Sequence, residues 1–303
     1  MFRTIQLFWM PNHRRAEACA EEAERYLVSR GVTVLRPEDM DSDRFPAAQP
    51  QDADSDRIPQ LMITFGGDGT LLGGARRALQ MDIPLMGINL GTIGFLTEEE
   101  PSRLQEALER ILQGAYMMEE RFLLEAVVVP AEEHLPQAEP HPGEELPRSS
   151  ELSSAGTRLF ALNDVVVSRG GFARLIRTEC TVNGEPYGVF TADGLVVSTP
   201  TGSTGYNLSA GGPIVEPGMD CMIITPICPH SLQHCSSVIS SRSEIRISLC
   251  PDRSQSAVLQ IDGQSVADLR AGDEIVIRGT DRKMRLLRLH PYSFFTRIRK
   301  KIF

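Results

Sequence analysis

The spacing of hydrophobic residues changes near residue 121. Before it, apolar runs of strand length alternate with segments in which apolar residues recur every three or four positions, as in helices. The expected strands cover 4–9, 32–35, 61–65 and 83–89, and the expected helices cover 13–29, 71–79 and 101–113. The first helix should bury one face, made of Ala16, Cys19, Ala20, Ala23 and Leu27. Strands that alternate with helices predict a parallel, doubly wound α/β sheet.

After residue 121, short runs of β-forming residues follow one another without a helical period. These runs cover 122–129, 158–167, 175–182, 187–191, 194–198, 222–225, 244–249, 256–261, 273–278 and 284–289. They predict a second domain that is all-β. The basic, amphipathic residues 294–303 predict a terminal helix that packs on the protein rather than on a membrane, because so short a helix is marginal without packing.

Two polar stretches interrupt this pattern. Residues 37–59 are rich in Asp, Pro and Ser, and residues 130–157 are rich in Pro, Glu and Ser. Such compositions cannot bury a core, so both are predicted to be poorly ordered loops. The expected division is an α/β domain over residues 1–120 and a β-rich domain over residues 121–292.

Composition narrows the classes of partner. The 303 residues are enough for two cores, and the net charge of −9 argues against nucleic acid as the main partner. No apolar run reaches the roughly 18 residues of a membrane helix, and the first residues lead straight into a strand, so a cytoplasmic protein is expected. The six cysteines have irregular spacing, which predicts reduced thiols. The segment 228–235 lacks a standard zinc-site spacing, and no metal site made of protein side chains is predicted.

A glycine-rich segment, FGGDGT, begins with the last residue of the third expected strand. Gly66 and Gly67 allow a sharp turn close to a ligand, and Gly69 and Thr70 open a helix whose free amides favour phosphate. Asp68 is unusual beside phosphate, because like charges repel, which suggests that it binds a metal or accepts a proton from a hydroxyl. The alternative is that Asp68 only caps the helix. The P-loop pattern is absent from the sequence.

A second glycine-rich segment runs from Asp193 to Tyr206, with the sequence DGLVVSTPTGSTGY. Hydroxyl groups and bare backbone dominate its second half, which suits hydrogen bonds to ribose and phosphate. Tyr206 could pack beside an adenine ring or bond through its hydroxyl. The alternative is an ordinary Ser/Thr/Gly turn between two strands.

These motifs together resemble the NAD kinase family, in its bacterial form. The matching segments cover 66–70, 89–97, 162–166, 192–194, 198–209, 210–214, 225–232 and 262–264. The first motif alone is weak evidence, since lipid kinases and phosphofructokinases share it, but the whole set keeps the family's order and spacing. Residues 92 and 93 depart from the family's usual basic-then-leucine pair.

The resemblance implies transfer of the γ-phosphate of ATP to the 2′-hydroxyl of the adenosine ribose of NAD, which gives NADP. Asp68 would be the catalytic residue, and the family's C-terminal helix, here 293–303, would pack back on the first domain. The implied contacts to substrate are Asp68, Gly69, Asn163, Asp164, Arg174, Asp193, Thr204, Gly205, Tyr206, Asn207, Leu208, Ser209 and Gln264. Among them, Asn163 and Asp164 would hold NAD, Asp193 the nicotinamide part, and residues 204–209 the adenosine half. Phosphate would lie on Gly66, Gly67, Gly69 and Thr70.

The resemblance further implies a divalent ion, Mg²⁺, as cofactor and a homo-oligomer, dimer or tetramer. Two other functions stay open at this point. One is a lipid kinase that shares the first motif, and the other is a catalytically silent dinucleotide-binding sensor or scaffold. The preference between NAD and NADH, and between ATP and polyphosphate, also stays open.

Overall fold

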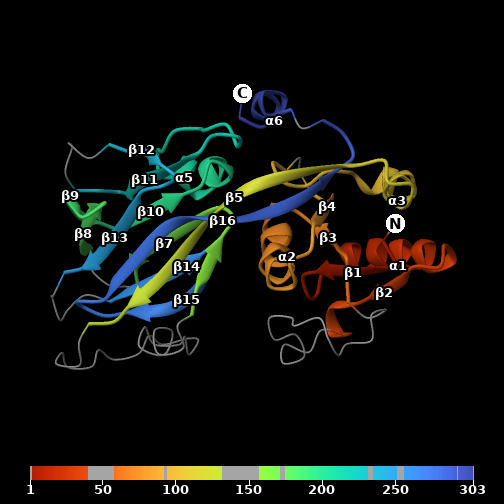
Figure 1. Cartoon of the computed structure of the whole chain (residues 1–303), viewed down its shortest axis with the longest axis horizontal. Helices are drawn as coiled ribbons and strands as arrows, with labels where there is room; N and C mark the ends of the chain where they lie inside the picture. The colour runs from red at the N-terminus through yellow and green to blue at the C-terminus, as the bar shows by residue number, and fades with distance from the viewer. Residues whose placement is uncertain are drawn as a thin grey trace. The chain divides into compact units, whose positions relative to one another are not determined.

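The computed structural model describes residues 2–39, 58–91, 94–131, 157–170, 175–230, 235–250, 256–291 and 293–302 (Figure 1). Two compact units result: Met1–Arg121 with Met284–Phe303, and Phe122–Lys283. The chain passes between the units within two strands, β5 (Met117–Val129) and β16 (Glu274–Arg288). Most of the two expected loops lies outside the described residues, and the expected boundaries, 1–120 and 121–292, stay a prediction.

The first unit is built on a parallel sheet with the order β2-β1-β3-β4. Its strands are β1 (Thr4–Trp9), β2 (Thr33–Leu35), β3 (Leu61–Gly66) and β4 (Leu85–Asn89). Its helices are α1 (Arg14–Ser29), α2 (Asp68–Met81), α3 (Leu104–Leu112) and α6 (Phe294–Lys301), with 3₁₀ turns at Pro37–Asp39 and Pro101–Arg103. The end of β16 pairs in parallel with β4, Leu286 beside Leu85.

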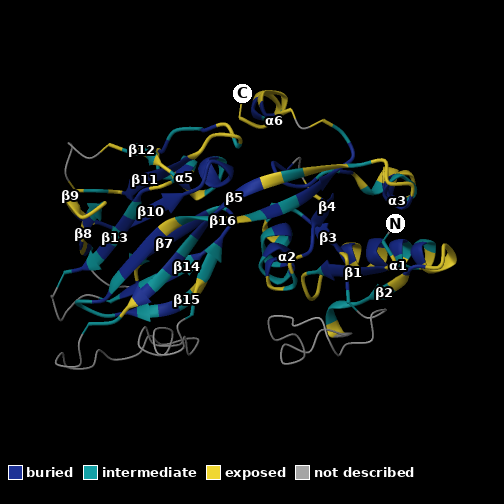
Figure 2. Cartoon of the chain, in the orientation of Figure 1, coloured by how far each residue is buried: buried dark blue, intermediate teal, exposed yellow. Residues whose placement is uncertain are grey.

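Successive side chains along the parallel strands point to opposite faces of the sheet, and apolar residues on both faces explain why helices cover both. Ile5, Leu7 and Ile63 belong to a core shared with α1 and α3. The intervening residues point the other way, since Thr64 and Phe8 lie against Gly74 of α2. Figure 2 shows β3 and β4 buried along their lengths, as strands covered on both faces must be. The predicted doubly wound sheet is confirmed, and α1 buries the face that the sequence indicated.

The second unit is a sandwich of two antiparallel sheets. One has the order β12-β11-β10-β7-β14-β15, and the other contains β9, β8, β13, the first part of β16, β5 and β6. Their remaining bounds are β6 (Leu159–Ala161), β7 (Asp164–Arg169), β8 (Ile176–Val182), β9 (Glu185–Ala192), β10 (Gly194–Ser198), β11 (Cys221–Ile227), β12 (Ser237–Ser240), β13 (Glu244–Leu249), β14 (Ala257–Ile261) and β15 (Gln264–Leu269). One apolar core, with Val165, Leu195 and Ile247 among its members, lies between the sheets. The predicted all-β second domain is confirmed.

Three details of the predicted elements are wrong. The runs 273–278 and 284–289 are one strand, β16, because its polar middle stays extended although its composition resembles a turn. The run 158–167 is two strands, β6 and β7, which a turn at Leu162–Asn163 separates. The pattern missed β12 and β15, and two short helical segments, η4 (Thr201–Thr204) and α5 (Tyr206–Ser209), interrupt the β-rich region.

Candidate active site

Asp68 is the first residue of α2, and Gly67 is the N-cap. The helix has no side-chain cap, so the alternative in which Asp68 is only a capping residue is wrong. The Asp68 carboxylate turns instead to the loop after β4. It accepts hydrogen bonds from the backbone N–H of Phe95 at 2.7 Å, Leu96 at 3.1 Å and Thr97 at 3.3 Å. Three donors from one loop fix both the position and the orientation of this carboxylate.

Two glycines are required by packing around Asp68. A Cβ on Gly66 would lie 2.2 Å from Oγ1 of Thr70, and a Cβ on Gly94 would lie 2.2 Å from Oδ1 of Asp68. Real side chains essentially never approach so closely, so the turn and the loop need glycine there. Gly67 and Gly69 differ, because a Cβ on either would meet no atom within 4 Å. The protein's own packing therefore does not require glycine at these two positions.

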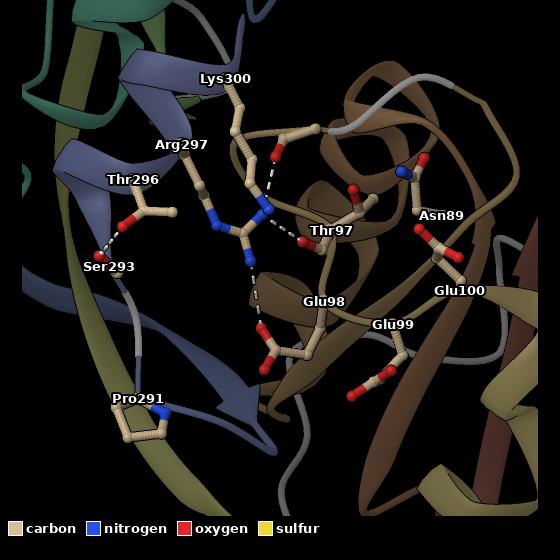
Figure 3. Close-up of a pocket in the computed structure, with 11 residues that line it drawn as sticks. Asn89, Thr97, Glu98, Glu99, Glu100, Pro291, Ser293, Thr296, Arg297 and Lys300 are labelled. Atoms are coloured by element: carbon tan, nitrogen blue, oxygen red, sulfur yellow. Dashed lines mark hydrogen bonds and ion pairs between the residues drawn. The ribbon is translucent and has the colours of Figure 1, made fainter.

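An ion pair and a second polar contact hold the rest of this loop. Glu98 is almost fully buried and pairs with the equally buried Arg288 at 3.1 Å, and Glu99 lies 2.5 Å from Nε2 of His290. A pocket of about 240 Å³ lies beside the loop, and Asn89 and Arg297 are among its lining residues (Figure 3). The hydroxyl of Thr97 is buried and has no hydrogen-bond partner among the described residues.

In the second unit, Asn163 and Asp164 stand at the start of β7. The hairpin turn between β14 and β15 reaches them through Asp262, whose φ of 49° is followed by 77° at Gly263. Two positive φ values in succession are typical of a type I′ turn. The Asp262 carboxylate accepts the backbone N–H of Leu162 at 2.9 Å, Asn163 at 2.6 Å and Asp164 at 3.1 Å. The turn therefore shapes the backbone that carries the predicted NAD contacts.

This environment changes the acidity of Asp164. Burial, followed by the negative charge of Asp262, raises the pKa of Asp164 to about 7. Asp164 is 4% exposed, so its carboxyl loses the water that would otherwise stabilise its charge. The side-chain oxygen of Asn163 is also buried, and it accepts no hydrogen bond from the described residues. A buried oxygen without a partner beside a desolvated carboxyl is typical of a binding site.

The segment after β10 covers the outer face of its sheet. Ala210 packs on a small apolar cluster of Val166, Val196 and Ile227. Gly202 lies against the backbone of Asn163, where a Cβ would come within 2.1 Å of the carbonyl oxygen. The segment is thus placed directly beside Asn163, as the sequence-based assignment of both to one site requires.

Burial divides the predicted contact residues 204–209 into one buried residue and five that solvent reaches. Asn207 is fully buried, donates to the carbonyls of Ser203 and Pro213 and accepts from Thr225, so its side chain is a framework of the loop. Thr204, Gly205 and Leu208 are partly exposed, and Tyr206 and Ser209 are exposed. These residues remain available to a ligand, whereas Asn207 is buried as a whole residue and its carbonyl already accepts the backbone N–H of Gly212.

Tyr206 lies among acidic groups. Burial first, and then the charges of Cys228, Asp193 and Asp164, raise the pKa of its hydroxyl. Asp193 itself forms an ion pair of 2.7 Å with Arg169, with both side chains partly exposed. The structure therefore brings Asp164, Asp193 and Tyr206 into one neighbourhood.

The remaining predicted contacts lie at the edge of this neighbourhood or outside the description. Gln264 is exposed at the start of β15, two residues after Asp262. Arg174 lies outside the described residues. Sequence reasoning chose Gln264 from the segment Asp262-Gly263-Gln264 and passed over Asp262. The sequence Asp-Gly at 262–263 does indicate a two-residue turn. It does not indicate that Asp262 bonds the backbone of three residues about 100 positions away.

Cysteine and metal chemistry adds little to this picture. Cys19, Cys180 and Cys221 are buried, and burial raises the pKa of Cys180 to about 12. Such thiols are poor nucleophiles. Within the described ranges, no group of three His, Cys, Asp or Glu side chains is arranged to hold a metal ion. Residues 231–234 of the segment 228–235 lie outside those ranges.

The part of the chain with described positions contains no helix long and apolar enough to cross a membrane.

Both units match the models of one family. Residues 5–116 match the ATP-NAD kinase N-terminal domain, and residues 162–289 match the ATP-NAD kinase C-terminal domain. An NAD kinase of Syntrophotalea carbinolica is 38% identical over 301 residues, which is 99% of this chain and 98% of the relative. The chain belongs to the NAD kinase family. The similarity extends to an NAD kinase of Heliobacterium modesticaldum, 43% identical over 80% of this chain and 78% of the relative.

Solved structures show the same fold at lower identity. Yeast NADH kinase, determined in complex with NADH, superposes with a TM-score of 0.79 at 23% identity and covers 99% of this chain and 87% of its own. An NAD kinase from Archaeoglobus fulgidus, determined in complex with ATP, gives a TM-score of 0.66 at 22% identity and covers 99% and 97%. The family models and the bacterial relatives confirm the NAD kinase resemblance drawn from the motifs, and these structures confirm the fold.

Proposed function

We propose that Asp68 is the general base in the ATP-dependent phosphorylation of NAD to NADP, the reaction of this family. The proton of the 2′-hydroxyl on the adenosine ribose passes to the Asp68 carboxylate as that oxygen attacks the γ-phosphorus of ATP. A bond forms between the ribose oxygen and phosphorus, the bond to the bridging β–γ oxygen breaks, and ADP leaves. The observation that supports this role is the carboxylate held by three backbone N–H groups.

The first turn of α2 is proposed to hold phosphate. Its amides have no side-chain cap, and a helix N-terminus favours anions. Gly66 and Thr70 form the tight turn before it. The open space at Gly67 and Gly69 supports the proposal, because glycine at these two positions is then explained by the close approach of a ligand rather than by protein packing.

The NAD contacts are proposed for the second unit. The unpartnered Asn163 oxygen and the buried Asp164 carboxyl suit the hydroxyls of a ribose. The proposal assigns the adenosine half to residues 204–209, the nicotinamide half to Asp193 and further contacts to Gln264 and Arg174. Asn207 is proposed to act within this segment by holding its loop in shape, because its side chain already bonds Ser203, Pro213 and Thr225.

A divalent ion, Mg²⁺, is proposed to accompany ATP. The oxygens of Asp68 already accept N–H groups, and the described residues show no cluster of acidic ligands, so the residues fit an ion held mainly by ATP phosphates and water. Bound in this way, it would supply neutralisation of charge on the transferred phosphate.

The test is incubation of the purified protein with ATP, Mg²⁺ and NAD, followed by an enzymatic cycling assay specific for NADP. The unaltered protein should form NADP, and Asp68→Asn should lower kcat by about 100- to 10,000-fold with the melting temperature unchanged. NADP formation at a near-normal rate by Asp68→Asn would contradict the role of base. Failure of the unaltered protein to form NADP would instead favour the catalytically silent sensor.

Other parts of the expectation remain proposals. Family membership leaves the lipid-kinase alternative without support. The dimer or tetramer predicted from the resemblance is tested by sedimentation velocity, and polyphosphate as donor by replacing ATP in the same assay. The cytoplasmic location and the absence of nucleic-acid and membrane partners stay predictions.

A further inference from the structure

The last helix of the chain, α6, is anchored to the loop that holds Asp68. Phe294 and Ile298 are its buried residues. On the same helix, Nη1 of Arg297 donates to the carbonyl of Gly94 at 2.7 Å and to the carbonyl of Thr97 at 2.8 Å. Figure 3 shows this guanidinium reaching from the helix toward Thr97 and Glu98. The loop therefore presents its N–H groups to Asp68 and its carbonyls to α6.

One helical turn beyond Arg297, Lys301 faces Asp68 directly. Its Nζ lies 3.8 Å from Oδ2 of Asp68 and 4.5 Å from the centre of the Phe95 ring. The side chains of Lys301 and Asp68 are 36% and 26% exposed, so water screens the pair only in part. Residues four apart share one face of a helix, which explains why Arg297 and Lys301 contact the same loop.

A cation at this position answers a difficulty in the proposed reaction. A carboxylate that must stand beside the phosphates of ATP repels them. The ammonium group of Lys301 is close enough to offset the charge of Asp68 without taking its place as proton acceptor. The simpler alternative is that Lys301 is one more cation at a helix C-terminus, like Arg299 and Lys300. Its charge would then only stabilise the helix by interacting with the helix dipole.

We propose that Lys301 is a positioning residue for phosphoryl transfer, which holds the Asp68 carboxylate and offsets its charge so that ATP binds beside it. The proposal rests on the proposed role of Asp68. It makes α6 part of the active site, although the helix carries none of the motifs from which the family was recognised.

The test is Lys301→Met, which removes the charge and keeps an unbranched side chain over Phe95. KM for ATP should rise by about 3- to 10-fold and kcat should fall, while KM for NAD changes by less than about twofold. Lys301→Arg should restore most of the loss. Arg299→Met removes a positive charge from the same helix end at an exposed position and should leave all three parameters unchanged.

A second measurement asks whether Lys301 acts through Asp68. Calorimetric titration gives the Kd for ATP of Lys301→Met in the unaltered and the Asp68→Asn backgrounds. Because the side-chain amide introduced by Asp68→Asn has no charge to offset, Lys301→Met should matter much less in that background. Equal weakening in both backgrounds, an unchanged KM for ATP in Lys301→Met, or an equal loss in Arg299→Met would overturn the proposal. None of these outcomes decides the proposed function, which is contradicted by near-normal NADP formation in Asp68→Asn or by no NADP formation in the unaltered protein.

Discussion

The carboxylate of Asp262 lies 2.6 Å from the backbone nitrogen of Asn163, from which it accepts a hydrogen bond. The same carboxylate accepts from the two residues on either side, and Asp262 donates its own N–H to the carbonyl of Asp164 at 3.0 Å. One hairpin turn therefore determines where β7 begins. If NAD binds at Asn163 and Asp164 as proposed, Asp262 contributes to that site through the backbone it holds.

Asp262→Asn should lower both stability and NAD affinity. The amide has one acceptor oxygen instead of two, so at least one N–H at the start of β7 loses its partner, at a cost of about 1–3 kcal/mol. Thermal unfolding and KM for NAD measure the two effects. Asp281→Asn, at an exposed position on β16, is the matched control. If Asp262→Asn behaved like this control, the turn would have no part in shaping the NAD site.

Gly94→Ala should lower kcat while the fold is kept. The new methyl group would lie 2.2 Å from Oδ1 of Asp68 and 2.3 Å from Oγ1 of Thr97, so the carboxylate must move. A displacement of about 1 Å at a reacting group can cost about 100-fold in rate. The measurement is kcat from steady-state kinetics of Gly94→Ala and of a control, Gly91→Ala. The methyl group of the control would meet no atom within 4 Å, so only Gly94→Ala should displace Asp68. Similar kcat values in the two variants would show that the loop absorbs the methyl group without moving Asp68.

Asp164→Asn should change how stability depends on pH. The pKa of Asp164 is raised from 3.8 to about 7 in the folded protein, so between these values the folded state binds a proton that the unfolded state has lost. Asp164 therefore makes stability fall as pH rises from about 4 to about 7, by up to about 1.4 kcal/mol per pH unit. Removing the carboxyl removes this slope.

Urea unfolding of the unaltered protein and of Asp164→Asn between pH 4.5 and 8 measures the difference. The variant should gain stability relative to the unaltered protein up to about pH 7 and gain nothing further above it. A difference that does not vary with pH would mean that Asp164 is ionised across the whole range.

Asp193→Ala should weaken NAD binding far more than ATP binding. Loss of a charged hydrogen-bond partner costs about 1.5–3 kcal/mol, or about 10- to 150-fold in Kd. The ion pair with Arg169 is partly exposed and should contribute only about 0–1 kcal/mol to stability. Calorimetric titration with each ligand is the measurement, and Arg169→Ala, which breaks the same pair but keeps the carboxylate, is the control. Equal weakening for both ligands with a lowered melting temperature would assign Asp193 to the turn instead.

Local patterns predicted most of the elements, and distant partners account for what they missed. The spacing of Ala16, Cys19 and Leu27 is enough to place α1, because helix amphipathicity is a short-range property. Asp262 and Asn163 are 99 positions apart, so no window of sequence contains their contact. The same holds for Lys301 and Asp68, which are still further apart along the chain. Within β16, the residues 279–281 favour a turn locally, and pairing with neighbouring strands overrides that preference.

The pairing of β16 with β4 has a consequence for synthesis on the ribosome. Leu287 and Leu289 belong to the core beneath β1, β3 and β4, and Arg288 is the partner of the buried Glu98. A nascent chain that ends before residue 284 has every other strand of the first sheet but lacks these three residues. A buried carboxylate without its cation is strongly unfavourable. The first unit is therefore translated first but can complete its core only after residues 287–289 have been synthesised, and an unfinished sheet exposes apolar surface of the kind that chaperones bind.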